Sequence, residues 1–181
     1  MKDKEIKITK IFHELHGEKA RLSNLILVYT VGIISALIFT IILLPLKLSI
    51  WKYILVAVLV LDISSGVVAN LSTPTNQYYQ KNSRLRLIFL SLHILQPLLF
   101  IVIFPELLLF FLFVFLYTIS ASLIVNWIKD KEYQQNIASA FVVLGTILSF
   151  VFKNDILIVY AIAPLFMTKL ILGFAVRRPI F

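Results

Sequence analysis

The sequence predicts an all-α integral membrane protein, a bundle of six transmembrane helices with an N-terminal amphipathic helix at the membrane interface. Of its 181 residues, 60% are hydrophobic and only 14% are charged, whereas a soluble domain carries about a quarter charged residues. A water-soluble chain of this length could not bury so much apolar surface. The chain has no cysteine, which excludes disulfide bonds, thiolate nucleophiles and cysteine-ligated metals.

Six apolar segments predict the spans, because a helix needs about 20 mostly apolar residues to cross the hydrocarbon core. They cover approximately residues 22–45, 50–71, 85–104, 106–127, 137–152 and 156–176. The fifth is short and is expected to extend back through Gln134 and Gln135. Pro105 predicts a tight hairpin between the third and fourth spans, since proline is tolerated where a helix begins. The transmembrane domain is thus expected over residues 22–178, with a short tail at 179–181.

Residues 1–21 form a leader with an amphipathic pattern. Ile8, Ile11, Phe12 and Leu15 recur at helical spacing, with charged residues between them. This pattern predicts a short helix lying on the cytoplasmic face of the membrane. The alternative is a solvated leader that packs on the loops.

The distribution of lysine and arginine predicts the orientation. With the N-terminus inside, thirteen of the 17 basic residues fall on the cytoplasmic side, three on the outer side and Lys169 within a span. The outer three are Lys47, Lys52 and Lys153. We therefore expect a multi-pass protein of the plasma membrane with both termini in the cytoplasm. The net charge of +8 is then explained by topology and by anionic inner-leaflet lipids, without a nucleic-acid partner.

Ionisable residues inside spans are costly and are candidates for function. Asp62 lies in the second span, His93 in the third and Lys169 in the sixth. At 1.5 Å of rise per residue, they lie about 13, 12 and 10 Å from the cytoplasmic ends of their spans. Three helices therefore carry an ionisable group in nearly the same layer. The alternatives are a structural hydrogen bond for His93 and, for Lys169, snorkelling to the cytoplasmic interface.

Further polar residues extend this layer towards the cytoplasm. Ser65 shares a helical face with Asp62, together with small residues that favour close helix packing. The candidate ligand-binding residues are Asp62, Ser65, Asn70, Arg86, His93, Gln96 and Lys169. No metal site is predicted, because His13 and His16 have no third ligand of certain position. The sequence identifies neither catalytic residues nor a cofactor.

The run Asp62-x-x-Ser65-Gly66-x-x-Ala69-Asn70 resembles half of the signature of the CDP-alcohol phosphatidyltransferases. The resemblance implies six spans, an amphipathic leader and a site on the cytoplasmic side. That family has a second aspartate where Ser65 stands and an arginine where Asn70 stands. Its two later aspartates, expected near Ser83 and Leu87, are missing. Asp62 alone cannot hold two metal ions, so the resemblance does not predict their chemistry here.

The outer halves of the third and fourth spans contain no polar side chain over residues 98–104 and 107–116. An open pore would be lined with polar groups at both depths, so the pattern favours a pocket open to the cytoplasm. We expect this pocket to bind a small molecule, a lipid headgroup or a partner membrane protein. The alternatives are a small-molecule carrier or substrate-capture module, and a membrane enzyme acting on a phospholipid or headgroup.

Overall fold

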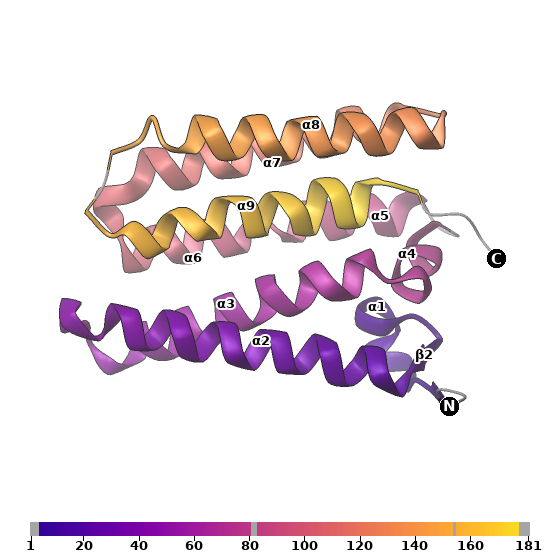
Figure 1. The fold of residues 1–181 in the computed structure, drawn as a ribbon, viewed down its shortest axis with the longest axis horizontal. Coiled ribbons are helices and arrows are strands. Elements are labelled where there is room, and N and C mark those ends of the chain that lie inside the picture. The colour runs from indigo at the N-terminus through magenta and orange to yellow at the C-terminus, as the bar shows by residue number, and fades with distance from the viewer. Residues whose placement is uncertain (1–3, 81–82, 154, 178–181) are drawn as a thin grey trace.

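Long helices lying side by side make up most of the chain (Figure 1). The computed structural model describes residues 4–80, 83–153 and 155–177, and the predicted tail at 179–181 lies outside them. The long helices are α2 (Leu22–Leu43), α3 (Ile50–Leu71), α7 (Leu108–Trp127) and α8 (Lys131–Ser149). Shorter ones are α4 (Thr73–Gln80), α5 (Ser83–Leu92), α6 (Leu95–Ile103) and α9 (Ile162–Met167). Over these described residues, the fold is all-α apart from one pair of strands.

Short helices of other pitch join or extend these elements. They are the 3₁₀ turns η2 (Leu44–Leu46), η3 (Pro105–Leu107) and η4 (Leu157–Ala161), and the π-helix η5 (Thr168–Ala175). Within the described residues, five segments are long and apolar enough to cross a membrane: Leu22–Leu46, Ile50–Leu71, Arg84–Ile103, Pro105–Trp127 and Leu157–Ala175. This number of apolar helices indicates a multi-pass membrane protein.

The predicted fifth span corresponds to α8, which differs from the other long helices in composition. It begins at Lys131, earlier than its apolar stretch, because the Asp130 carboxylate caps it by accepting a hydrogen bond of 2.7 Å from the Tyr133 amide. Its first turns are polar, so the apolar part is shorter than in the five segments above. It nevertheless runs antiparallel to α7 along the side of the bundle (Figure 1).

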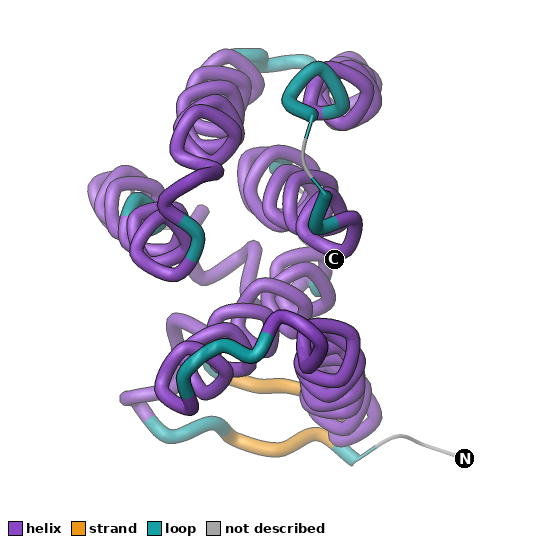
Figure 2. Tube along the Cα trace, turned by 90° about the vertical axis from the view of Figure 1, so that its left-hand side faces the viewer, coloured by secondary structure: helices purple, strands orange, loops and turns teal. Residues whose placement is uncertain are grey.

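The centre of the bundle is the C-terminal helical segment formed by α9 and η5. It packs against α3, α7 and α8, and Figure 2 shows it between the other helices. Met167, Leu170 and Ile171 are fully buried there. In contrast, α2 packs chiefly along α3 and exposes many apolar side chains. Lys169, the one charged residue on η5, is therefore buried inside the protein.

The predicted third span is interrupted, and its break shapes the candidate site. Helices α5 and α6 are separated by a turn at His93 and Ile94. Pro97 causes the break because it has no amide hydrogen to donate to the His93 carbonyl. The segment between the second and third spans contains α4.

The leader is not one continuous amphipathic helix over residues 8–15. It contains strand β1 (Glu5–Lys7), the turn η1 (Lys10–Phe12), the single-turn helix α1 (His13–His16) and strand β2 (Lys19–Arg21). The strands pair antiparallel, with Ile6 opposite Ala20. Gly17 allows the chain to reverse, since its φ is +73° and a Cβ there would overlap the backbone of Pro74. Because the chain turns back at Gly17 to form β2, the helical segment ends at His16.

Candidate functional site

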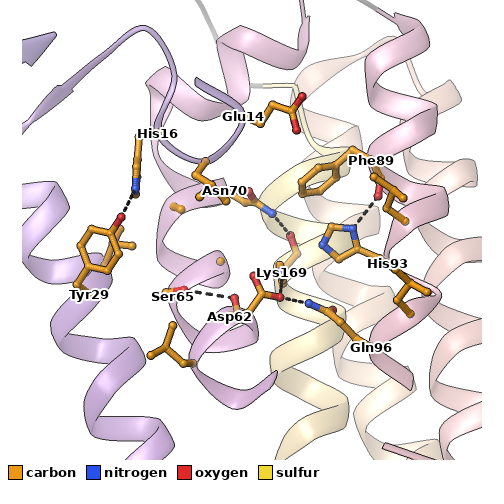
Figure 3. A pocket seen from close by; sticks show the side chains of 17 residues that line it. Glu14, His16, Tyr29, Asp62, Ser65, Asn70, Phe89, His93, Gln96 and Lys169 are labelled. Carbon is orange, nitrogen blue, oxygen red and sulfur yellow. Dashed lines mark hydrogen bonds and ion pairs between the residues drawn. The ribbon is translucent and has the colours of Figure 1, made fainter. Parts of the chain in front are cut away.

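A cavity of about 360 Å³ lies at the leader end of the bundle (Figure 3). Its walls are α3 on one side and α5–α6 on the other, with Lys169 of η5 behind them and α1 at its mouth. The volume is at the lower end of the range of about 300–1,000 Å³ typical of ligand pockets. Of the seven candidate residues, all but Arg86 line this cavity.

The Asp62 carboxylate is the centre of the polar network in the cavity. Lys169 Nζ donates a hydrogen bond of 2.9 Å to Asp62 Oδ2, and the Gln96 amide nitrogen donates to the same oxygen. The Lys169 side chain is only 3% exposed, whereas that of Asp62 is 45% exposed. A buried ammonium is tolerated only with a charged partner. Asp62 therefore compensates Lys169 while still facing the cavity, and Lys169 does not snorkel to the interface.

His93 takes its orientation from the helix break. Because the His93 amide bonds to the Leu90 carbonyl at 3.3 Å, the Phe89 carbonyl is left for the His93 ring. His93 Nδ1 lies 2.7 Å from that oxygen. A carbonyl only accepts, so Nδ1 carries the hydrogen and Nε2 of the neutral imidazole holds a lone pair. His93 is thus a ring anchored by the Phe89 carbonyl, and within the described residues its Nε2 has no hydrogen-bond partner.

Small residues on α3 let η5 approach closely enough for the ion pair. A Cβ on Gly66 would overlap the Lys169 side chain and lie 3.0 Å from its Nζ. The Ser65 hydroxyl donates to the Asp62 carbonyl at 3.3 Å, and Asn70 Nδ2 donates to the Lys169 carbonyl at 3.1 Å. Ser65 and Asn70 therefore line the cavity with side chains that hydrogen bonds to backbone carbonyls hold in place.

Arg86 binds backbone carbonyls of η5 and does not line the cavity. Its Nη2 donates to the carbonyls of Phe174 and Ala175 at 2.9 and 3.1 Å. Asn76 Nδ2 likewise donates to the carbonyls of Gly173 and Val176 at 3.1 and 2.8 Å. The last carbonyls of a helix have no partner within it, so these side chains cap the buried end of η5.

The leader contributes cavity residues that the sequence did not identify as such. Glu14 and His16 lie at the mouth, and His16 Nε2 is 2.8 Å from the hydroxyl of Tyr29 on α2. Burial lowers the pKa of His16 below its ordinary value. Thr75 Oγ1 also donates to the Leu15 carbonyl at 3.0 Å. Helical periodicity could not predict that the leader covers the mouth of the cavity, since this position depends on the chain reversal at Gly17.

Chemically, the site combines a carboxylate, a neutral imidazole and a buried ammonium beside apolar walls. No cluster of three or more metal-ligating side chains occurs within residues 4–80, 83–153 and 155–177. The arrangement can bind a polar head and an apolar body together. No protein family, curated protein or solved structure matches this chain.

Proposed function

We propose that this protein binds a small molecule with an apolar body in the cavity beside Asp62, from the cytoplasmic side of the membrane. The observation that carries this proposal is the half-exposed Asp62 carboxylate facing a cavity of about 360 Å³. Much of the wall is apolar, including Val28, Leu61 and Phe89. Ligand pockets typically have such a mainly apolar lining with a few polar groups.

The proposal includes six spans in the plasma membrane with both termini in the cytoplasm. The excess of basic residues on one side supports this orientation. The antiparallel course of α8 along α7 supports its counting as a span. The leader and the end of η5 also lie at the same end of the bundle (Figure 1), as an even number of crossings requires.

The leader would lie against the anionic inner leaflet. Ile11 is 82% exposed, and Phe12 and Leu15 are also exposed, although all three are large and apolar. Lys7 and Lys10 lie close to them in the sequence and are exposed. Exposed apolar side chains among basic ones suit a membrane interface, even without a continuous amphipathic helix.

A carrier is the second candidate, because Lys169 of the ion pair lies in the first turn of the π-helix η5, within the central helical segment. Paired intramembrane charges often mark transport pathways. A carrier would release the Asp62–Lys169 pair during its cycle. Three other functions are alternatives: binding of a lipid headgroup, binding of a partner protein, and an enzymatic reaction on a lipid in the cavity. Failure of small molecules to bind would favour these alternatives.

Isothermal titration calorimetry of the purified protein in detergent micelles tests ligand binding in the cavity. The probes are phenethylammonium, phenethyl alcohol and hydrocinnamate, which share an apolar body and differ in the polar group. We expect at least one to bind the native protein and to lose at least about tenfold affinity in Ala69→Leu, whose larger side chain fills the cavity. Ala140→Leu is the matched control on an exposed face of α8. Ser65→Leu is the second filling variant if Ala69→Leu does not fold. Binding that is unchanged in the filled variants would contradict the proposal.

A further inference from the structure

We infer that the cavity selects a cationic amphiphile, with a protonated amine or similar donor head beside Asp62 and an apolar body along the α5–α6 wall. This inference rests on the proposed function and adds the chemical class of the ligand. It follows from which hydrogen-bonding atoms around the cavity are already used and which remain.

The donor atoms around the cavity already have protein acceptors. Lys169 Nζ and Gln96 Nε2 donate to Asp62, while Asn70 Nδ2 and Ser65 Oγ donate to backbone carbonyls. His93 Nδ1 donates to the Phe89 carbonyl. Each of these donor atoms is thus oriented by a protein acceptor, and Asp62 Oδ2 accepts from two of them.

By contrast, three acceptor atoms have no hydrogen bond within the described residues, and one of them, Asp62 Oδ1, belongs to a half-exposed side chain. Within the described residues, no hydrogen bond reaches Asp62 Oδ1, and the Asp62 side chain is 45% exposed. The Gln96 NH₂ faces the Asp62 carboxylate, so the amide oxygen points away from it. That oxygen is buried without a partner, on a residue that is 8% exposed. His93 Nε2 adds a lone pair. Unpaired acceptors in a poorly hydrated site attract donors and positive charge.

The charges around the cavity lead to the same class of ligand. Lys169 and Asp62 compensate each other, and Glu14 at the mouth adds a second carboxylate (Figure 3). With His16 and His93 both neutral, the lining has one excess negative charge. One monovalent cation would balance it. Cations near carboxylates in a partly desolvated site are held by charge-assisted hydrogen bonds, which are stronger than neutral ones.

The apolar part of the ligand has a surface along one edge of the cavity. Leu92 and Leu95 line the cavity and are both more than half exposed. In a membrane these two leucines would face lipid, so a tail could lie against them while the head reaches Asp62. The Phe89 ring in the same wall is held in place by stacking on Phe174, with ring centroids 4.2 Å apart, and adds apolar surface.

The three calorimetric probes separate this inference from the proposed function. We expect phenethylammonium to bind at least about tenfold more tightly than phenethyl alcohol, and hydrocinnamate to bind most weakly. Tighter or equal binding of the alcohol or the carboxylate would overturn the inference, while leaving ligand binding in the cavity intact. If none of the three binds the native protein, both proposals fail.

Variants that remove a charge test which residues give the cavity its preference for the ammonium probe. Glu14→Gln, at an exposed mouth residue, should reduce the preference for the ammonium over the alcohol severalfold. Asp62→Asn combined with Lys169→Met should reduce it by a larger factor, because the carboxylate beside the donor head is lost while no buried charge is left unpaired. Glu132→Gln removes the same charge at an exposed position on α8 and should leave the preference unchanged. An unchanged preference in the Asp62→Asn, Lys169→Met protein would overturn the inference.

Discussion

Lys169 and Asp62, 107 positions apart in the sequence, form an ion pair of 2.9 Å in which the two partners are buried to very different extents. The ammonium lies inside the bundle, and the carboxylate faces the cavity. Removing Asp62 should therefore destabilise the protein more than removing Lys169, because a lysine left unpaired would be a charge without access to water.

We expect Asp62→Asn to lower the free energy of unfolding by about 3 kcal/mol or more, because it leaves the Lys169 charge unpaired. Lys169→Met should cost less, since the Asp62 carboxylate can be hydrated in the cavity. The double variant should recover much of the loss in Asp62→Asn. Denaturant titrations of the four proteins in detergent measure these values. Purely additive effects would show that the two residues are not coupled.

Gly66 should be intolerant of alanine although it lies within a helix. Alanine in place of glycine normally stabilises a helix by about 0.5–1 kcal/mol. Here the new methyl group would overlap the Lys169 side chain, so we expect Gly66→Ala to destabilise the protein by about 1–3 kcal/mol. The same substitution in a Lys169→Ala background should be neutral or stabilising. Thermal unfolding measures both effects, and a destabilisation that persists in that background would place the clash elsewhere.

Cysteine labelling should establish whether α8 crosses the membrane. The chain has no native cysteine, so single cysteines can be introduced at exposed Lys19, Ser49, Lys131 and Lys153. Six spans predict that an impermeant thiol reagent labels the Ser49 and Lys153 positions in intact cells. The Lys19 and Lys131 positions should react only after permeabilisation. Labelling of the Lys131 and Lys153 positions from the same side would show that α8 does not cross.

From the sequence, the arithmetic of helical rise predicts that Asp62, His93 and Lys169 lie in one layer, because each is in an apolar segment long enough for a span. It could not show that Lys169 pairs with Asp62, because the rotation of each helix depends on packing around the central α9–η5 segment. Arg86 is polar and lies in a span, as a ligand-binding residue would. Its backbone-capping role becomes visible only when η5 ends beside it. The position of the leader over the mouth of the cavity depends on the chain reversal at Gly17, which no periodicity in the sequence predicts.

Asn76 should be a strong determinant of stability, because its side-chain amide caps two carbonyls at the end of η5. Asn76→Leu keeps the volume and removes the donor, leaving both carbonyls buried without it. We expect a loss of about 2–4 kcal/mol in the free energy of unfolding. Asn136→Leu, at an exposed position on α8, should change it by less than about 0.5 kcal/mol. Equal effects of the two substitutions would show that the caps contribute nothing specific.

The docking of the leader should weaken in acid because of His16. Burial lowers the pKa of His16 from its ordinary value of 6.5, so protonation favours the open leader, in which the ring is hydrated. The stabilisation is complete above about pH 6.5 and is lost progressively as the pH falls below that value. Amide hydrogen exchange of residues 5–21, corrected for intrinsic rates, should show less protection at about pH 5 than at about pH 7.5.

Two substitutions assign this effect to His16. His16→Gln keeps a polar side chain near the Tyr29 hydroxyl, which lies 2.8 Å from the native ring, and cannot titrate. It should therefore abolish the pH dependence of leader protection, whereas His13→Gln on the same turn should retain it. If the native protein shows equal protection at both pH values, His16 is not the group that holds the leader. Because Glu14 and His16 lie at the mouth of the cavity, release of the leader would also widen access to Asp62, so affinity and leader protection should change over the same pH range.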